Sequence, residues 1–131
     1  MTRLDASVTA HVDAMHHPRC EQIERTREAV LAADERLVES VKWNAPSYAI
    51  GTHLVTLRLR PGDRVEAILH RGAATLREHP LADALSDALS DPDGRLDWRA
   101  PDRAVLVLTP GEDPALLTAL VEQWLAAVAP R

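Results

Sequence analysis

The sequence predicts an α+β domain with N-terminal helices, an antiparallel sheet of about five strands, and a C-terminal helix packed on the sheet. Apolar residues recur at helical spacing in the first third and again near the C-terminus, whereas the middle alternates with a period of two. Short turn signals separate the alternating segments, as in a meander of hairpins. A length of 131 residues suits one domain, so we expect an N-terminal helical extension over 1–17 and a core over 18–129.

Three helical segments are expected before the sheet. The first, with capping oxygens at Asp5 and Ser7, carries the apolar series Leu4, Val8, Val12 and Met15. Pro18 suits the first turn of the second, whose inward face is expected to hold Cys20, Ile23, Arg27, Val30 and Leu31. A third, short helix is expected from Asp34, as its N-cap, to Val41.

The sheet and the last helix follow from alternation and turn chemistry. Strands are expected over 47–50, 54–60, 65–70, 96–99 and 103–109, with turns at 51–52, 61–63 and 91–94. A helical turn or two is expected among Leu76, Leu81, Leu85 and Leu89. Asp113 and Pro114 start the final helix, whose inward stripe is Leu117, Leu120, Val121, Trp124, Leu125 and Val128.

The charge balance and the single cysteine restrict the function. Lys+Arg 15 against Asp+Glu 20 gives a net charge of −5, which disfavours binding to nucleic acid or to anionic membranes. One cysteine excludes an intrachain disulfide. Neither a membrane span nor a signal peptide is evident in the sequence, so a cytoplasmic protein is expected, as a monomer or homodimer.

The most informative segment is Lys42-Trp43-Asn44-Ala45-Pro46-Ser47-Tyr48, which holds the only lysine, the only asparagine and the only tyrosine of the chain. A lone lysine among fourteen arginines indicates a place for a compact ammonium group. Aromatic rings beside a cation and an amide can line a pocket for a small polar or anionic ligand. The alternative is a structural elbow, with Trp43 packed in the core and Asn44 satisfying backbone groups.

This segment, with Leu59-Arg60-Pro61-Gly62-Asp63-Arg64-Val65 and Leu69-His70-Arg71-Gly72-Ala73, resembles the YdhG-like family of uncharacterised bacterial domains. The resemblance runs from about Cys20 to the C-terminal helix. It implies a small α+β domain with an antiparallel sheet. Some members are described as frataxin-like iron chaperones that serve iron–sulfur and haem assembly, so the resemblance also implies a possible iron-delivery role.

Two sets of residues are candidate metal ligands. His16-His17-Pro18-Arg19-Cys20 brings histidine and cysteine to near-helical spacing, but no fourth ligand is evident. Glu21, Glu24 and Glu28 begin an acidic series that continues through Asp34, Glu35 and Glu39, and carboxylates of this kind could hold iron weakly. The intervening arginines favour an ordinary solvated helix face instead. The aspartates of 83–93 do not have the spacing of a calcium loop.

No nucleophile motif or phosphate-binding glycine loop is present. The sequence therefore favours a binding domain for a small polar ligand or a protein partner, without a cofactor, at a site formed by Lys42, Trp43, Asn44, Tyr48 and His70. Two alternatives remain. One is an iron-binding protein that uses Glu21, Glu24 and Glu28, and the other is an enzyme with His70 as its acid/base group.

Overall fold

The structure is a computed structural model, and it describes residues 3–60, 62–72, 86 and 89–130. Two helices come first, α1 (Ala6–Met15) and α2 (Cys20–Leu31). Four strands follow: β1 (Val38–Lys42), β2 (Ala45–Ile50), β3 (Thr52–Arg58) and β4 (Val65–Leu69). The chain then forms β5 (Leu96–Ala100), β6 (Arg103–Leu108) and α4 (Ala115–Val128). The leucines expected to form a helical turn at 76–85 lie outside the described residues.

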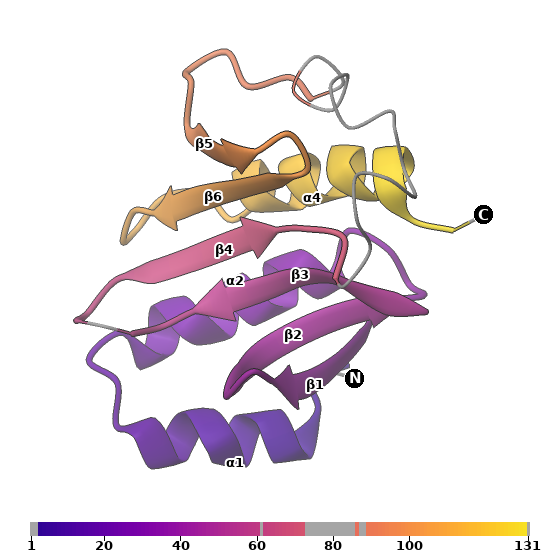
Figure 1. Ribbon diagram of the computed structural model, residues 1–131. Coiled ribbons are helices and arrows are strands. Elements are labelled where there is room, and N and C mark those ends of the chain that lie inside the picture. The colour runs from indigo at the N-terminus through magenta and orange to yellow at the C-terminus, as the bar shows by residue number, and fades with distance from the viewer. Residues whose placement is uncertain (1–2, 61, 73–85, 87–88, 131) are drawn as a thin grey trace.

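The predicted α+β class is confirmed. All strand pairs are antiparallel, and the described residues form one six-stranded sheet in the order β1-β2-β3-β4-β6-β5. Helices α2 and α4 pack on one face of the sheet, and α1 lies along its β1–β2 side (Figure 1). We call the face covered by α2 and α4 the helix side, and the face that carries Ser47, Thr56 and Ile68 the open side.

The strand that was not predicted is β1, which lies where the third helix was expected, so the prediction of that helix was wrong. Residues 38–42 form β1, which pairs with β2 from Val38↔Ala49 to Lys42↔Ala45. The Asp34 carboxylate does act as a cap, but it accepts the backbone N–H of Arg36 in a turn rather than at a helix start. The β-branched residues Val38 and Val41 favour the extended chain that follows.

Helix α4 packs as its apolar spacing predicts. Leu117, Leu120, Val121, Trp124 and Leu125 are all buried. The Trp124 indole N–H lies within hydrogen-bond distance of two carbonyl oxygens, those of Leu54 (3.1 Å) and His70 (3.2 Å). These bonds connect α4 to β3 and to the residue that follows β4.

The predicted N-terminal extension packs with the rest of the domain. Val8 and Val12 of α1 belong to the same apolar core as the sheet and α4. Asp5 caps α1, because its carboxylate accepts the N–H groups of Ser7 and Val8. The Arg3 guanidinium donates to four carbonyl oxygens at the end of α2 and in the turn after it, those of Leu31, Asp34, Glu35 and Leu37.

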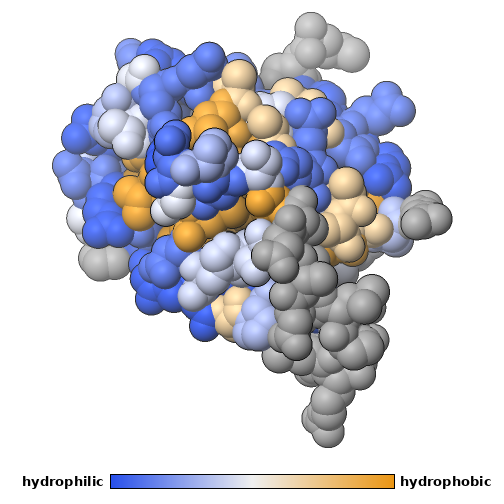
Figure 2. Space-filling model, turned by 90° about the horizontal axis from the view of Figure 1, so that it is seen from above, coloured by the Kyte–Doolittle hydropathy of each residue, from blue (hydrophilic) through white to orange (hydrophobic). Residues whose placement is uncertain are grey.

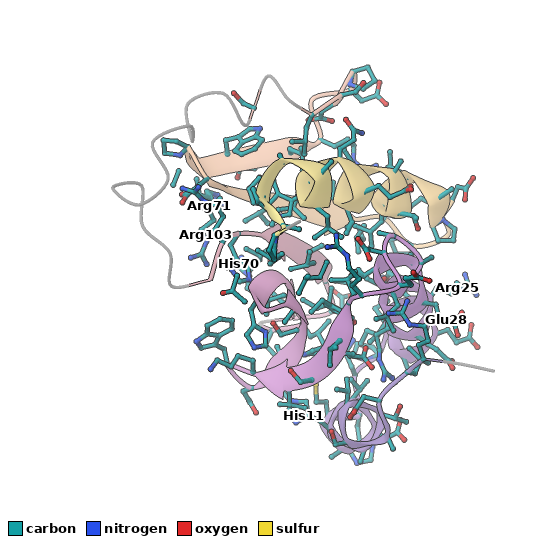
Figure 3. All side chains as sticks on the ribbon, turned by 90° about the vertical axis from the view of Figure 1, so that its right-hand side faces the viewer. His11, Arg25, Glu28, His70, Arg71 and Arg103 are labelled. Carbon is teal, nitrogen blue, oxygen red and sulfur yellow. The ribbon has the colours of Figure 1, made fainter. Side chains whose placement is uncertain are left out.

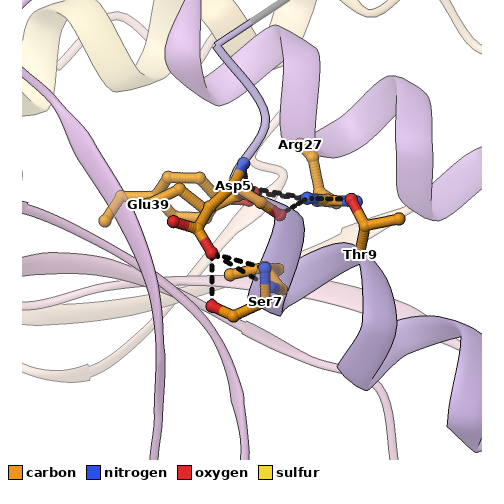
Figure 4. A network of polar contacts seen from close by, with 7 residues as sticks. Asp5, Ser7, Thr9, Arg27 and Glu39 are labelled. Atoms are coloured by element: carbon orange, nitrogen blue, oxygen red, sulfur yellow. Dashed lines mark hydrogen bonds and ion pairs between the residues drawn. The ribbon is translucent and has the colours of Figure 1, made fainter.

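A buried ion pair joins α1, α2, β1 and β2 on the helix side of the sheet (Figure 4). The Arg27 guanidinium donates to both oxygens of the Glu39 carboxylate, at 2.8 and 2.7 Å. That carboxylate also accepts the Tyr48 hydroxyl (2.8 Å) and the backbone N–H of Asp5 (2.8 Å). Arg27 also donates to Thr9 Oγ1 at 3.1 Å and to the Asp5 carbonyl oxygen at 3.3 Å, so the buried positive and negative charges compensate each other within one hydrogen-bonded network.

The upper surface of the molecule shows an apolar area bordered by hydrophilic residues (Figure 2). On β5, β6 and α4, the elements toward this side, the large apolar side chains with marked exposure are Val107 and Leu116. Single exposed residues of this kind are ordinary on a protein surface.

Among the described residues, none of the helices has both the length and the apolar character needed to cross a bilayer.

Candidate functional site

Neighbouring strands place a row of polar side chains on the open side of the sheet. Ser47 of β2 pairs with Thr56 of β3, which in turn pairs with Ile68 of β4. Ser47 and Thr56 are buried although both carry hydroxyls, and so is His70, which follows β4. Buried polar groups need partners, so the hydrogen bonds of this row define what it can do.

The row is a continuous chain of four hydrogen-bonded side chains. Ser47 Oγ lies 2.8 Å from His53 Nδ1 and 2.8 Å from Thr56 Oγ1. Thr56 Oγ1 lies 2.8 Å from His70 Nε2. We call the four residues His53, Ser47, Thr56 and His70 the open-side chain. It crosses three strands and links two imidazoles through two hydroxyls.

A β-bulge lets both His53 and Thr56 reach Ser47. Residues three apart on a regular strand face opposite sides of a sheet. The pairing between β2 and β3 shifts register at Tyr48/Ala49, and beyond this shift His53 lies on the same face as Thr56, as their two bonds to Ser47 Oγ show. Bulges commonly redirect a side chain in this way.

Gly72 fixes the direction of the hydrogen bond between His70 and Thr56 in the open-side chain. Its backbone N–H donates to His70 Nδ1 at 2.8 Å, so the proton of the neutral imidazole lies on Nε2 and is donated to Thr56 Oγ1. Gly72 has a φ of +64°, and a Cβ at this position would lie 2.6 Å from Thr52 Oγ1 and 3.1 Å from the His53 carbonyl oxygen. Only glycine fits here without displacing its neighbours.

Both imidazoles of the open-side chain are held in the neutral form. Burial, with the positive charge of Arg103, lowers the pKa of His70 to about 4. Burial and the charge of Lys42 lower the pKa of His53. Because both ring nitrogens of His70 are already engaged in hydrogen bonds, this residue presents its ring to the surroundings and not a free nitrogen.

Trp43 covers the two imidazoles from the tip of the β1–β2 hairpin. Its ring makes edge contacts with the rings of His53 (centroids 5.5 Å apart) and His70 (5.7 Å), yet it is 60% exposed. Trp43 and Asn44 form a two-residue turn with φ of 52° and 60°, the backbone of a type I′ hairpin. Such turns favour asparagine, aspartate and glycine, so a tryptophan here is held in a costly conformation.

A groove of about 540 Å³ opens beside Trp43 on the open side. Its wall includes Trp43, Asn44, Thr56, Ile68 and His70, and its basic lining residues are Arg58, Arg60 and Arg103. Figure 3 shows His70, Arg71 and Arg103 together on this side of the molecule, away from Arg25 and Glu28 of α2. Helix α1 supports the hairpin tip, because His11 Nε2 lies 3.0 Å from the Asn44 carbonyl oxygen.

Four of the five predicted site residues lie near this groove. Trp43, Asn44 and His70 line it, and Lys42 Nζ lies 5.4 Å from the centroid of the Trp43 ring. The elbow interpretation expected Trp43 to pack in the core, but its side chain is exposed. The fifth residue, Tyr48, lies elsewhere: it is fully buried on the helix side, where its hydroxyl donates to Glu39, and burial raises its pKa well above the ordinary value.

Ser47, His53, Thr56 and Arg103 complete the site, and sequence reasoning missed them as functional residues. The alternation of the strands was a usable signal, since it places Glu66, Ile68 and His70 on one face. The sequence did not reveal the bulge that redirects His53. The expected meander of hairpins would place β5 beside β4, and this was wrong: β6 pairs with β4, and its register brings Arg103 toward His70.

The candidate metal ligands have structural contacts or lie on the surface. His17 uses both ring nitrogens, since Nδ1 accepts the Arg19 N–H and Nε2 contacts the Leu59 carbonyl oxygen. Cys20, expected on the inward face, is exposed, and its thiol contacts the His17 carbonyl oxygen. Glu21, Glu24 and Glu28 are exposed on α2, whereas Glu39 is buried with Arg27. Within the described ranges, no three histidine, cysteine or acidic side chains gather as a metal site.

Comparisons of this chain with protein-family models, with curated proteins and with solved structures found no match. The YdhG-like resemblance therefore stays a prediction, and the function has to be argued from the geometry of the groove.

Proposed function

We propose that this domain binds a small molecule in the groove beside Trp43. One observation carries the proposal: a large aromatic residue is exposed at a hairpin tip, in a left-handed backbone conformation, directly over a cavity. A residue in such a conformation costs about 1–3 kcal/mol. Asparagine or glycine at this position would avoid that cost. The contact surface of the Trp43 ring is therefore the reason we assign for a tryptophan at this turn.

The size and the walls of the groove favour a small ligand over a protein partner. Ligand cavities commonly have volumes of about 300–1,000 Å³, with mostly apolar walls and a few polar groups. The groove of about 540 Å³ falls in this range. Its floor is held in place by the open-side chain, and its Trp43 wall is supported by α1 through the bond between His11 and the Asn44 carbonyl oxygen.

Binding without catalysis is the simplest role for His70 in this proposal. An acid/base residue has to exchange a proton with a substrate, and its pKa is best near the working pH. The nitrogens of His70 are occupied by Thr56 and Gly72, and its pKa of about 4 keeps it neutral near pH 7. His70 is then a fixed wall of the groove that orients Trp43.

Indole N–H signals in ¹H–¹⁵N NMR spectra test this function. The chain has three tryptophans, so a screen of small polar and aromatic compounds is read from three resolvable signals. We expect binding compounds to shift the Trp43 signal and to leave the signals of buried Trp124 and partly buried Trp98 nearly unchanged. Trp43→Asn keeps a residue suited to the turn but has no Trp43 signal, so binding to this variant is read from the ring signals of His53 and His70. We expect the compounds that shift these ring signals in the wild-type protein to leave them unchanged in the variant.

Leu116→Ala is the matched control, because Leu116 is also an exposed apolar residue but lies on α4. It should bind the same compounds as the wild-type protein. Compounds that bind equally well to the Trp43→Asn variant, or that shift only the Trp98 signal, would show that the groove beside Trp43 is not the binding site.

A further inference from the structure

We infer that the ligand of this groove is a small organic anion with a planar apolar body, whose negative charge binds Arg103, with Lys42 also near the groove, and whose body contacts Trp43. This inference rests on the proposed function and specifies the chemical class of the ligand. Three independent features of the described residues support it: the signs of the charges around the groove, the pairing state of its cations, and the apolar side chains of its lining.

The charge around the groove is opposite to that of the whole protein. The chain has a net charge of −5 with twenty acidic residues. Among the described residues that line the groove, three are arginines and none is an aspartate or a glutamate. The sole lysine lies next to the same wall, with its ammonium group above the Trp43 ring. A local positive region on an acidic protein concentrates anions there.

The cations at and beside the groove differ in whether a carboxylate of the protein pairs with them. Arg58 donates to Glu66 at 2.6 Å, and Arg71 donates to Asp102 at 3.0 Å, so these two charges are compensated within the protein. Lys42, Arg60 and Arg103, in contrast, form no salt bridge with any carboxylate of the part of the chain that the structure describes, and all three are exposed.

Besides burial, the same positive region lowers the pKa values of the two histidines at the ends of the open-side chain. Arg103 lowers the pKa of His70 and Lys42 lowers that of His53, in each case after burial as the larger cause. Both imidazoles therefore stay neutral at pH 7, and the charge that an anion meets comes from Lys42 and Arg103. A guanidinium can bind a carboxylate or a phosphate with two parallel hydrogen bonds.

The groove also has apolar side chains in its lining. Trp43 and Ile68 line the groove, and the hydroxyls of Ser47 and Thr56 are already used within the open-side chain. Apart from Asn44 and the arginines, the described lining of the groove therefore offers few unused polar side-chain groups. A ligand that is charged at one end and planar and apolar in its body matches this arrangement, whereas a polyol such as a sugar would leave its hydroxyls without partners.

The test compares three fragments of similar shape: benzoate, phenyl phosphate and the neutral isostere benzamide. Each is titrated into the protein at low ionic strength, and the shift of the Trp43 indole signal gives the affinity. We expect benzoate or phenyl phosphate to bind about tenfold or more tightly than benzamide, since one charge-assisted hydrogen bond is worth at least that factor. The stronger of the two anions identifies a carboxylate or a phosphate as the natural charged group.

Arg103→Met and its matched control Arg25→Met remove the same charge from opposite sides of the molecule (Figure 3). We expect Arg103→Met to weaken the preferred anion about tenfold and Arg25→Met to leave its affinity unchanged. Equal affinity of benzamide and the anions would overturn the anion inference but leave the binding groove intact. No shift of the Trp43 signal with any ligand, in this titration and in the broader screen, would overturn the proposed function as well.

Discussion

The sheet carries a buried polar cluster on each of its faces, and the two clusters differ in kind. On the helix side, Arg27 and Glu39 form an ion pair whose remaining hydrogen-bond capacity is taken up by Tyr48, Thr9 and the backbone of Asp5. On the open side, His53, Ser47, Thr56 and His70 form a neutral chain that ends under an exposed tryptophan and near cations that have no carboxylate partner among the described residues.

The difference teaches how a structural cluster can be told from a functional one. Within the described residues, every buried side-chain nitrogen and oxygen has a partner, so satisfaction of hydrogen bonds does not separate the two clusters. What separates them is their surroundings. The helix-side cluster is enclosed by two helices and compensates its own charge, whereas the open-side chain supports a cavity lined by Arg60 and Arg103, which pair with no carboxylate in the described part of the chain.

The largest effect is expected from breaking the helix-side cluster. Glu39→Leu leaves the buried Arg27 charge without its partner, so we expect a loss of about 3–5 kcal/mol in the free energy of unfolding. Urea denaturation measures it. Glu28→Leu, on the exposed face of α2, should change stability by less than about 0.5 kcal/mol. A loss below about 1 kcal/mol for Glu39→Leu would mean that the ion pair does not stabilise the fold.

The open-side chain is expected to make stability depend on pH. The pKa of His70 is about 4 in the folded protein against 6.5 for the free side chain. Between these values the unfolded chain binds a proton that the folded protein excludes, so stability is fully present above pH 6.5 and falls as the pH drops toward 4. The total change amounts to about 3 kcal/mol at most, measured by urea denaturation at several pH values.

His70→Gln separates this contribution from that of the carboxylates, which titrate in the same range. The variant keeps a donor for Thr56 but has no titrating group, so its stability should change less between pH 6.5 and pH 4 than that of the wild-type protein. Parallel curves for the two proteins would show that His70 is not held in the neutral form by the fold.

The smallest effect is expected at the hairpin tip. Asn44 has a φ of 60° in the two-residue turn, and glycine is favoured at this second position. Asn44→Gly should therefore raise stability by up to about 1 kcal/mol, read as an increased melting temperature. Because the Trp43 ring is unchanged, ligand binding should be retained. A lower melting temperature would show that the Asn44 side chain stabilises the tip by contacts beyond its backbone conformation.

The sequence predicted the strands and helices that have a strong local pattern. Alternation located β3, β4, β5 and β6, and apolar spacing located α4 with its buried Trp124. The prediction failed at residues 34–41, where the local pattern is ambiguous. There the extended conformation is stabilised by hairpin pairing with β2 and by the contact between Glu39 and Arg27 of α2, and the apolar spacing of residues 34–41 reveals neither.

The candidate site was predicted in part for the same physical reason. Lys42, Trp43 and Asn44 were evident because unusual residues cluster in one short segment. Tyr48 was included because it belongs to that segment, but strand alternation places it on the other face of the sheet. Arg103 and Thr56 lie far away in sequence and reach the groove only through strand order and register, which local patterns do not determine.

The position of the sole lysine gives this protein an unusual chemical handle. Amine-directed reagents, such as succinimidyl esters, have only the α-amino group and the Lys42 ammonium group to modify, and the latter lies 5.4 Å from the centroid of the Trp43 ring. Because an α-amino group loses its proton at a lower pH than a lysine side chain, it can be blocked first at neutral pH. A dye, a spin label or a tethered fragment coupled afterwards at mildly basic pH is then delivered to Lys42, beside the groove, without any engineered cysteine. The tryptophan beneath it can report the coupling by its own fluorescence.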